Sequence, residues 1–153
     1  MYYNLNNKIV QSLESITPLN RSFRYGDGFF ESILYHNHAI PLWKYHYQRL
    51  VTTIQFLFGE SIAVPTDIDL QIAIHELCKV NQLSNAKVRI TFWRKGGGTY
   101  RALENEFDYL IEASMLDIKQ SNSFSSALYV PPPFRQNVMR TFAFESWFTL
   151  QSS

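Results

Sequence analysis

A tight acidic turn followed at once by a strand is the feature that most constrains how this chain can fold. Gly26 and Gly28 flank Asp27, and this arrangement indicates a turn with unusual backbone angles. The segment that follows, FFESILYH at 29–36, has the composition of a strand. Its alternation places on one face Phe30, Ser32 and Leu34. The other face carries Phe29, Glu31, Ile33 and Tyr35.

Most of the remaining chain has the pattern of strands that follow one another as hairpins. The chain opens with YYNL and KIVQ around an Asn6-Asn7 turn, which predicts a hairpin. An Asn37-His38 turn leads to AIPLW (39–43), which we predict to return as a partner strand. Further strands are predicted at AKVRITFWR (86–94), FDYLIEASML (107–116) and SSALYV (125–130).

Two segments change to a helical period. Between Lys44 and Phe58 apolar residues recur at steps of three and four, and Gly59 is expected to end this helix. Thr66 is a suitable N-cap for a second helix that ends near Asn81. Its predicted buried stripe consists of Ile68, Ile72 and Leu77. Strands outnumber helices, so the sequence predicts an α+β domain with a mostly antiparallel sheet and two main helices.

The end of the chain differs from the rest. Pro131-Pro132-Pro133 imposes a stiff extended segment, such as commonly leads from one domain to the next. The residues after it are rich in Phe and Trp and are too apolar for a free tail. We therefore expect residues 1–130 to form one small α+β domain. Residues 131–153 are expected to be a linker-like segment and the truncated tail of a longer protein.

Composition and charge argue against several classes of function. The formal net charge is +1 with no basic run, which argues against nucleic acid as a partner. No window approaches the roughly 20 apolar residues of a membrane span, and the N-terminus lacks the pattern of a signal peptide. A single cysteine, Cys78, excludes an intrachain disulfide and fits a cytoplasmic protein. No cluster of His, Asp and Glu has the spacing of metal ligands, so no metal site is predicted.

Two arginines are candidates for binding an anion. Arg49 lies beside the apolar stripe of the first helix, where it is either a solvated charge or a phosphate ligand with a planar fork of donors. His46 lies one helical turn earlier and could brace it. Arg89 shares a strand face with Thr91 and Trp93, opposite a purely apolar face. This is either an ordinary solvated face or a carboxylate-binding wall, where nearby aromatic rings lower the local dielectric constant.

The segment from Asn20 to Leu50 resembles the N-terminal signature of the class IV aminotransferase family. That signature combines Y-G-D-G, F-E-[TSG]-I and H-x-x-R-L, and YGDG, FESI and HYQRL occur here in this order. AKVRITFWRKGGGTY (86–100) resembles a later family strand with its glycine-rich end, so the resemblance covers about residues 1–137. The family consists of pyridoxal-phosphate enzymes, among them branched-chain aminotransferases, D-amino acid aminotransferases and aminodeoxychorismate lyases.

The resemblance implies roles for several residues. Arg49 would contact the cofactor phosphate, and Tyr25 would be an aromatic residue of the pocket. The substrate would be contacted by Phe30, Ser32, Leu34 and Arg89. The resemblance also implies a small N-terminal domain joined to a larger one, a homodimer, and a small amino-acid or amino-chorismate-type substrate. The motif YGDGFFES leans towards the lyase and the D-amino acid enzymes, and the choice between transaminase and lyase stays open.

One family feature is missing from this sequence. The family carries its Schiff-base lysine shortly after the linker in a pattern like [FI]-K-[TS], whereas the last lysine here is Lys119. The best match, Phe144-Glu145-Ser146, has Glu145 at the lysine position, so no catalytic residue is assigned. With the C-terminal cofactor domain also absent, we expect the chain alone to be inactive and not to bind pyridoxal phosphate. Truncation or a frameshift near Val138 is the preferred explanation, and a non-catalytic dimerisation or interaction domain is the alternative.

Overall fold

The structure, a computed structural model, describes residues 1–96, 100–103 and 105–116. All of them belong to one compact unit, Met1–Asp117. The predicted domain end at residue 130, the predicted strand at 125–130, the triple proline and Glu145 lie outside the described residues. These predictions therefore stay predictions.

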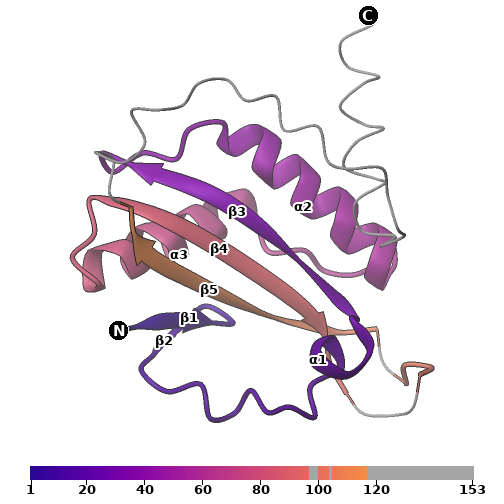
Figure 1. Cartoon of the computed structure of the whole chain (residues 1–153). Coiled ribbons are helices and arrows are strands. Elements are labelled where there is room, and N and C mark those ends of the chain that lie inside the picture. The colour runs from indigo at the N-terminus through magenta and orange to yellow at the C-terminus, as the bar shows by residue number, and fades with distance from the viewer. Residues whose placement is uncertain (97–99, 104, 117–153) are drawn as a thin grey trace, which may run out of the picture. The chain divides into compact units, whose positions relative to one another are not determined.

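One antiparallel sheet organises the described residues (Figure 1). Its strands are β1 (Tyr3–Leu5), β2 (Lys8–Val10), β3 (Gly28–His36), β4 (Asn85–Arg94) and β5 (Phe107–Met115). Their order is β2-β1-β5-β4-β3, and all neighbours are antiparallel. The helices α2 (Trp43–Phe58) and α3 (Asp67–Val80) cover one face, and the short α1 (Arg21–Tyr25) lies at one end of the sheet. The predicted α+β class, the antiparallel sheet and the two main helices are confirmed.

The core lies between the sheet and the two long helices. From the strands it takes Phe29, Ile33, Tyr35, Val88, Ile90 and Phe92, together with residues of β5. From the helices it takes Leu50, Ile54, Leu70, Ile74 and Leu77. Each fully buried side chain of this size stabilises the fold by about 1.5–3 kcal/mol relative to an exposed one. The two faces of β3 predicted from the alternation are confirmed by this burial.

The predicted strand at 39–43 does not form. The chain makes only an isolated bridge between His36 and Ala39 before it enters α2. Pro41 has no backbone N–H to donate to a ladder, and Leu42 adopts left-handed angles (φ 56°) at the N-cap of α2. β3 is therefore the last strand at this edge of the sheet.

The buried side of α3 differs from the predicted stripe. Leu77 is fully buried, but Ile68 and Ile72 are 66% and 48% exposed. The residues that α3 buries are Leu70, Ala73, Ile74, Leu77 and Cys78. This set follows the i, i+3, i+4, i+7, i+8 spacing of one helix face, and Ile68 and Ile72 lie on another side. The N-cap is as predicted, because Thr66 Oγ1 accepts a hydrogen bond from the Asp69 N–H at 3.1 Å.

The loop before the Gly-Asp-Gly turn contains a helix that the sequence pattern did not reveal. α1 has five residues, which is too short for a hydrophobic period to be recognised. Asn20 begins it with a side-chain oxygen that accepts a hydrogen bond from the Ser22 N–H at 2.8 Å. Gly26 ends it in the left-handed conformation (φ 65°), so the unusual backbone angle predicted at this glycine is confirmed.

Candidate functional site

The carboxylate of Asp27 lies at the centre of the turn that opens β3. Nε of Arg21 donates a hydrogen bond to Oδ2 at 2.8 Å, and Nε of Arg94 donates to the same oxygen at 3.1 Å. The three side chains are shielded, with 4% of Arg21, 12% of Arg94 and 19% of Asp27 exposed. One carboxylate thus holds two guanidinium groups by charge-assisted hydrogen bonds. We call these three residues the Asp27 cluster.

The Asp27 cluster ties several segments together. Nη2 of Arg21 donates to the carbonyl oxygen of Tyr100 at 3.1 Å. Arg94 donates to the Leu57 carbonyl oxygen and, at 2.8 Å, to Asn105 Oδ1. The cluster therefore joins α1, the last turn of α2, β4 and the β4–β5 connection. From the sequence Asp27 was recognised only as a turn residue, because one of its partners lies 67 positions away.

Tyr25 lies beside this cluster. The guanidinium carbon of Arg21 is 4.9 Å from the centroid of the Tyr25 ring, and that of Arg24 is 5.5 Å away. Tyr100 packs edge-on against the same ring, with 6.4 Å between the centroids. These contacts place Tyr25 at the end of the sheet where the Gly-Asp-Gly turn meets the β4–β5 connection.

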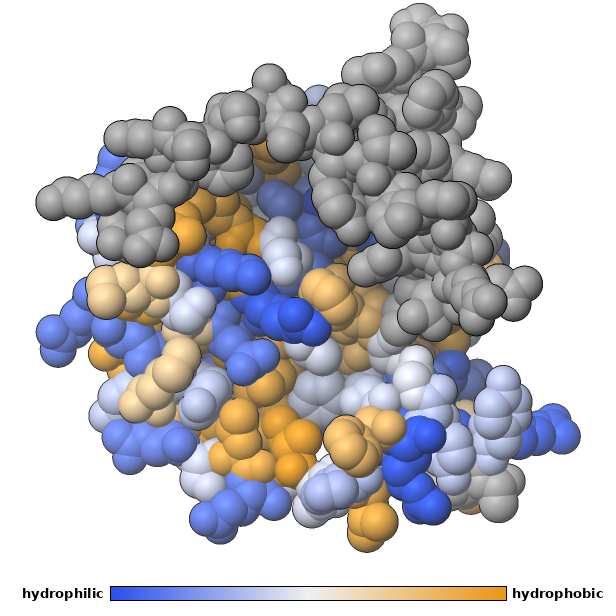
Figure 2. All heavy atoms as spheres, in the orientation of Figure 1, coloured by the Kyte–Doolittle hydropathy of each residue, from blue (hydrophilic) through white to orange (hydrophobic). Residues whose placement is uncertain are grey.

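The sheet face that α2 and α3 leave uncovered carries most of the predicted substrate-side residues. Phe30 and Leu34 are 52% and 43% exposed, and Ser32 between them is exposed as well. Arg89 lies opposite Ser32 in the β3–β4 register. Its guanidinium carbon is 3.4 Å from the centroid of the Phe30 ring, which is a cation–π contact. Figure 2 shows hydrophilic and hydrophobic residues side by side on this face.

The stacking leaves the donors of Arg89 available. Within the described part of the chain, the Arg89 guanidinium makes no hydrogen bond or ion pair. The Phe30 ring covers one flat side of the group, whereas its N–H bonds point outward in its plane. Phe30, Ser32 and Arg89 thus come together in an arrangement that can hold a carboxylate.

Arg49 lies with Glu31 and His46. Nε of Arg49 is 3.4 Å from Oε2 of Glu31, and Nη2 donates to Oε1. Nδ1 of His46 is 2.6 Å from the same Oε1 and 2.9 Å from Nη2 of Arg49. Nδ1 cannot accept a hydrogen bond from Arg49 while its own proton goes to Glu31. Both α2 residues are therefore donors to the carboxylate.

The structure separates Arg49 from the other predicted site residues. Glu31, the partner of Arg49, belongs to the helix-covered face of β3, and Phe30 and Leu34 belong to the opposite face. The two groups thus lie on the two sides of one edge strand. Sequence reasoning did not find Glu31, although its spacing from the H-x-x-R motif, inside a strand with a buried face, was a usable signal.

Arg49 can supply one contact to a phosphate group. The side chain is 43% exposed, and its Nη1 makes no hydrogen bond to another described residue. A phosphate dianion takes several strong donors, so a single guanidinium beside the carboxylate of Glu31 is only one part of such a site. Among the described residues, no group of three or more His, Cys, Asp or Glu side chains could hold a metal ion.

Lys95, the residue that follows β4, lies near two carboxylates. Its Nζ lies 3.4 Å from Oε2 of Glu106 and 3.4 Å from Oδ1 of Asp108. The negative charge of Asp108 raises the pKa of Lys95. A lysine that attacks an aldehyde needs a lowered pKa, so this environment has the opposite effect.

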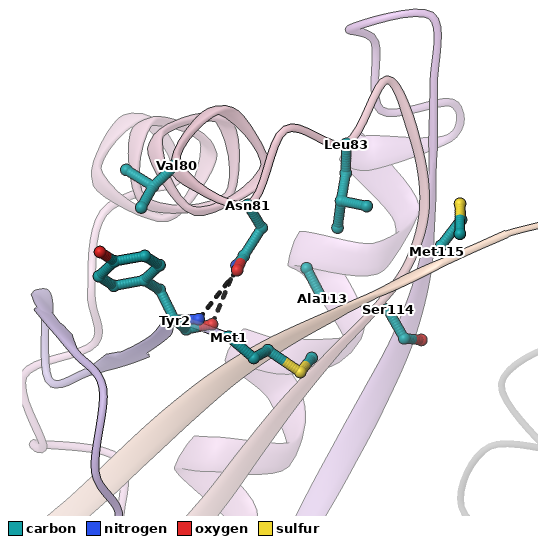
Figure 3. A pocket seen from close by; sticks show the side chains of 8 residues that line it. All are labelled: Met1, Tyr2, Val80, Asn81, Leu83, Ala113, Ser114 and Met115. Carbon is teal, nitrogen blue, oxygen red and sulfur yellow. Dashed lines mark hydrogen bonds between the residues drawn. The ribbon is translucent and has the colours of Figure 1, made fainter.

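Two surface hollows lie elsewhere in the unit. One of about 440 Å³ lies between the N-terminus, the end of α3 and the end of β5 (Figure 3). Asn81 closes its floor through hydrogen bonds of 2.8 and 2.9 Å with the backbone of Tyr2. A second, of about 480 Å³, is lined by Tyr35, His38, His75 and Lys79 among others. Burial raises the pKa of Tyr35, and its hydroxyl is 3.1 Å from Nδ1 of His75.

Two further properties of the described residues concern the Cys78 thiol and the helices. Cys78 is buried, and burial raises the pKa of its thiol to about 11, which keeps it protonated and unreactive near neutral pH. No helix in the described part of the chain has both the length and the apolar character needed to cross a membrane.

The α+β unit and its signature residues define a member of a known family. The family model described as "Amino-transferase class IV" matches residues 28–143, which is most of the chain. The chain therefore belongs to the class IV aminotransferase family. Members of this family are pyridoxal-phosphate-dependent transferases that act on amino-acid substrates.

Solved structures with a similar fold include three branched-chain aminotransferases. The enzyme of Thermobaculum terrenum in its pyridoxal-phosphate form is 17% identical, with a TM-score of 0.66 over 81% of this chain and 43% of that one. The Escherichia coli enzyme is 19% identical, with a TM-score of 0.64 over 75% and 41%. The enzyme of Thermoproteus uzoniensis with norvaline is 24% identical, with a TM-score of 0.60 over 76% and 41%.

These likenesses establish the fold alone. The chain spans about two-fifths of the length of the three enzymes. No curated protein matches it significantly.

Proposed function

We propose that this chain forms the substrate-side domain of a pyridoxal-phosphate-dependent aminotransferase or aminodeoxychorismate lyase of class IV. The observation that carries the proposal is Arg89, which stacks on Phe30 beside Ser32 on the sheet face that α2 and α3 leave uncovered. Amino acids and amino-chorismate compounds both carry carboxylates, which a guanidinium binds by paired hydrogen bonds. The norvaline in the Thermoproteus uzoniensis enzyme supports a carboxylate-bearing amino acid as the substrate.

Different residues of the domain would contact the substrate and the phosphate of the cofactor. Arg89 would hold the substrate carboxylate, and the exposed rings and methyl groups of Phe30 and Leu34 would exclude water from that side. Tyr25 would lie at the mouth of the pocket, next to the Asp27 cluster. Arg49 would bind the cofactor phosphate across the edge of β3. Pyridoxal phosphate, when bound, supplies a conjugated ring that takes up the electron pair released at the substrate α-carbon.

We further propose that these 153 residues are inactive by themselves. The chemistry needs a lysine amine, and the best match to the family's lysine motif has Glu145 at that position. The proposed organisation is a small domain at 1–130 followed by a linker-like segment at 131–153, in a cytoplasmic homodimer. In a complete enzyme of the family, the remaining phosphate donors and the lysine would come from outside this small domain.

Addition of pyridoxal phosphate to the purified chain is expected to leave no single lysine modified after borohydride reduction. Peptide mass mapping should find only scattered labelling of surface lysines, in proportion to the concentration of pyridoxal phosphate, because the best match to the family's lysine motif has Glu145 at that position. A complete class IV enzyme treated in parallel is the positive control. One lysine labelled stoichiometrically, together with a visible absorption band, would contradict the proposed inactivity.

The role of Arg89 can be measured by titrating the chain with L-norvaline and following the arginine side-chain N–H signals by NMR. We expect the Arg89 signal to shift, and Arg89→Leu to weaken binding by about tenfold or more, as a lost charge-assisted pair implies. Lys87→Ala removes a cation from the same face of the same strand and is the matched control. It should change the affinity less than about threefold, since its charge acts through water. Equal effects of the two variants would argue against a specific carboxylate site.

A second candidate is a non-catalytic domain that dimerises through this face. The exposure of Phe30 and Leu34 favours it, because apolar side chains on an uncovered sheet face promote self-association. The same titration separates the two candidates. If the face were buried in a dimer, the response of Arg89 to norvaline would fade as the protein concentration rises.

A further inference from the structure

Glu31 is the acidic residue on the helix-covered face of β3. Its neighbours along that face, Phe29 and Ile33, are core residues, and its own side chain is only 14% exposed. A carboxylate in such a place is unfavourable unless it is paired and hydrogen-bonded. The structure pairs it with His46 and Arg49, which lie one turn apart on α2.

This pairing sets the direction of the Arg49 guanidinium. The edge formed by Nε and Nη2 faces Glu31, with Nε 3.4 Å from Oε2 and Nη2 bonded to Oε1. His46 holds the same carboxylate from its Nδ1 at 2.6 Å. The guanidinium is rigid and planar. When its Nε–Nη2 edge is bonded to Glu31, Nη1 therefore points away from Glu31. Within the described residues, Nη1 has no acceptor, and 43% of the side chain is exposed.

We propose that Glu31 is a positioning residue for Arg49, a role that rests on the proposed phosphate contact of Arg49. Glu31 aims the free edge of the guanidinium outward, and His46 keeps the carboxylate in place. An arginine side chain has many rotamers, and the entropy lost on ordering it is lost before the anion arrives if Glu31 already holds it. A pre-ordered guanidinium therefore binds a phosphate more tightly than a mobile one.

A competing effect has the opposite sign. Glu31 is negatively charged, so its removal would strengthen anion binding on electrostatic grounds alone. His46 and Arg49 both donate to the carboxylate, which offsets part of its charge, and 43% of the Arg49 side chain is exposed to a solvent of high dielectric constant. We expect the ordering of Arg49 to outweigh this repulsion.

Two variants separate position from charge. Glu31→Asp keeps the charge and draws the carboxylate back by one methylene, and Glu31→Gln keeps the length and removes the charge. The ligand-free readout is the NMR signal of the Arg49 Nε–Hε group and the rate at which its proton exchanges with water. We expect exchange at least about threefold faster in both variants, with the Arg94 Nε–Hε signal unchanged as an internal reference for the fold. Wild-type exchange of Arg49 in Glu31→Asp would overturn the proposal, whether or not Glu31→Gln folds.

A titration with inorganic phosphate then separates this role from the proposed function. Glu31→Asp should weaken the response at Arg49 at least about threefold although the net charge is unchanged, and Arg49→Met should abolish that response. If phosphate leaves the wild-type Arg49 signal unmoved, the phosphate role of Arg49 fails, and the ligand-free measurement still decides the role of Glu31. Tighter phosphate binding in Glu31→Gln with unchanged Arg49 exchange would identify Glu31 as a competitor and overturn the proposal.

Discussion

Replacement of Gly28 by alanine is expected to lower the free energy of unfolding by about 3 kcal/mol or more. A methyl group at this position would overlap the carbonyl oxygen of Phe92 and would lie 3.1 Å from Cα of Trp93. Both atoms belong to the backbone of β4, so they can move only if the β3–β4 ladder opens where Gly28 faces Trp93. Unlike a flexible side chain, the ladder cannot give way at small cost.

Gly26→Ala is the matched control for this prediction. Gly26 has a positive φ of 65°, but no atom lies within 4 Å of an added methyl group. Alanine at Gly26 should therefore cost only the strain of the left-handed conformation, about 1 kcal/mol. Urea unfolding followed by circular dichroism measures both variants. Similar losses at the two glycines would show that β3 and β4 are not in close approach at Gly28.

Replacement of Asp27 by asparagine is expected to cost about 3 kcal/mol of unfolding free energy. The change keeps the shape of the side chain but removes the only charge in the Asp27 cluster that opposes two guanidinium groups, 4% and 12% exposed. Removing the carboxylate of a shielded ion pair takes away favourable charge–charge contacts that water does not replace in a poorly solvated place. Loss of the cluster should also loosen α1 and the β4–β5 connection, which hydrogen exchange can follow.

The control for Asp27 is Glu106→Gln. Glu106 is 73% exposed and pairs with Lys95, which is 39% exposed. Surface pairs of this kind contribute about 0–1 kcal/mol, so the control should unfold at nearly the wild-type urea concentration. An Asp27→Asn variant as stable as Glu106→Gln would show that the cluster does not hold the turn.

The sequence was sufficient for the elements whose burial is local and periodic. β3 and most of β4 alternate between buried and more exposed residues, and their faces follow from that alternation. The start and end of α3 follow from its capping chemistry at Thr66 and from the change of pattern near Asn81. Where the pattern was short or interrupted, prediction failed. A strand was expected across Pro41, and the five-residue α1 was missed.

Some features of the candidate site were also predictable from the sequence, and others were not. Alternation grouped Phe30, Ser32 and Leu34 on one face, and burial confirms that they share it. Arg89 was recognised as unusual on its strand, but its stack on Phe30 depends on the register between β3 and β4. The bond between Arg49 and Glu31 joins a helix to a strand 18 positions away, so it depends on how α2 packs on β3.

The sequence by itself determined which residues of β3 face the core and which family motifs the chain carries, because both depend on neighbours within a few positions. Only the tertiary structure decided which charges meet. Asp27 faces Arg94 from 67 positions away, and Arg49 turns to Glu31 and not to the open face. The physical reason is that shielded carboxylates take whichever donors the packing of helices on the sheet brings within hydrogen-bond distance. That packing results from burial summed over the whole unit and is not encoded in any short segment.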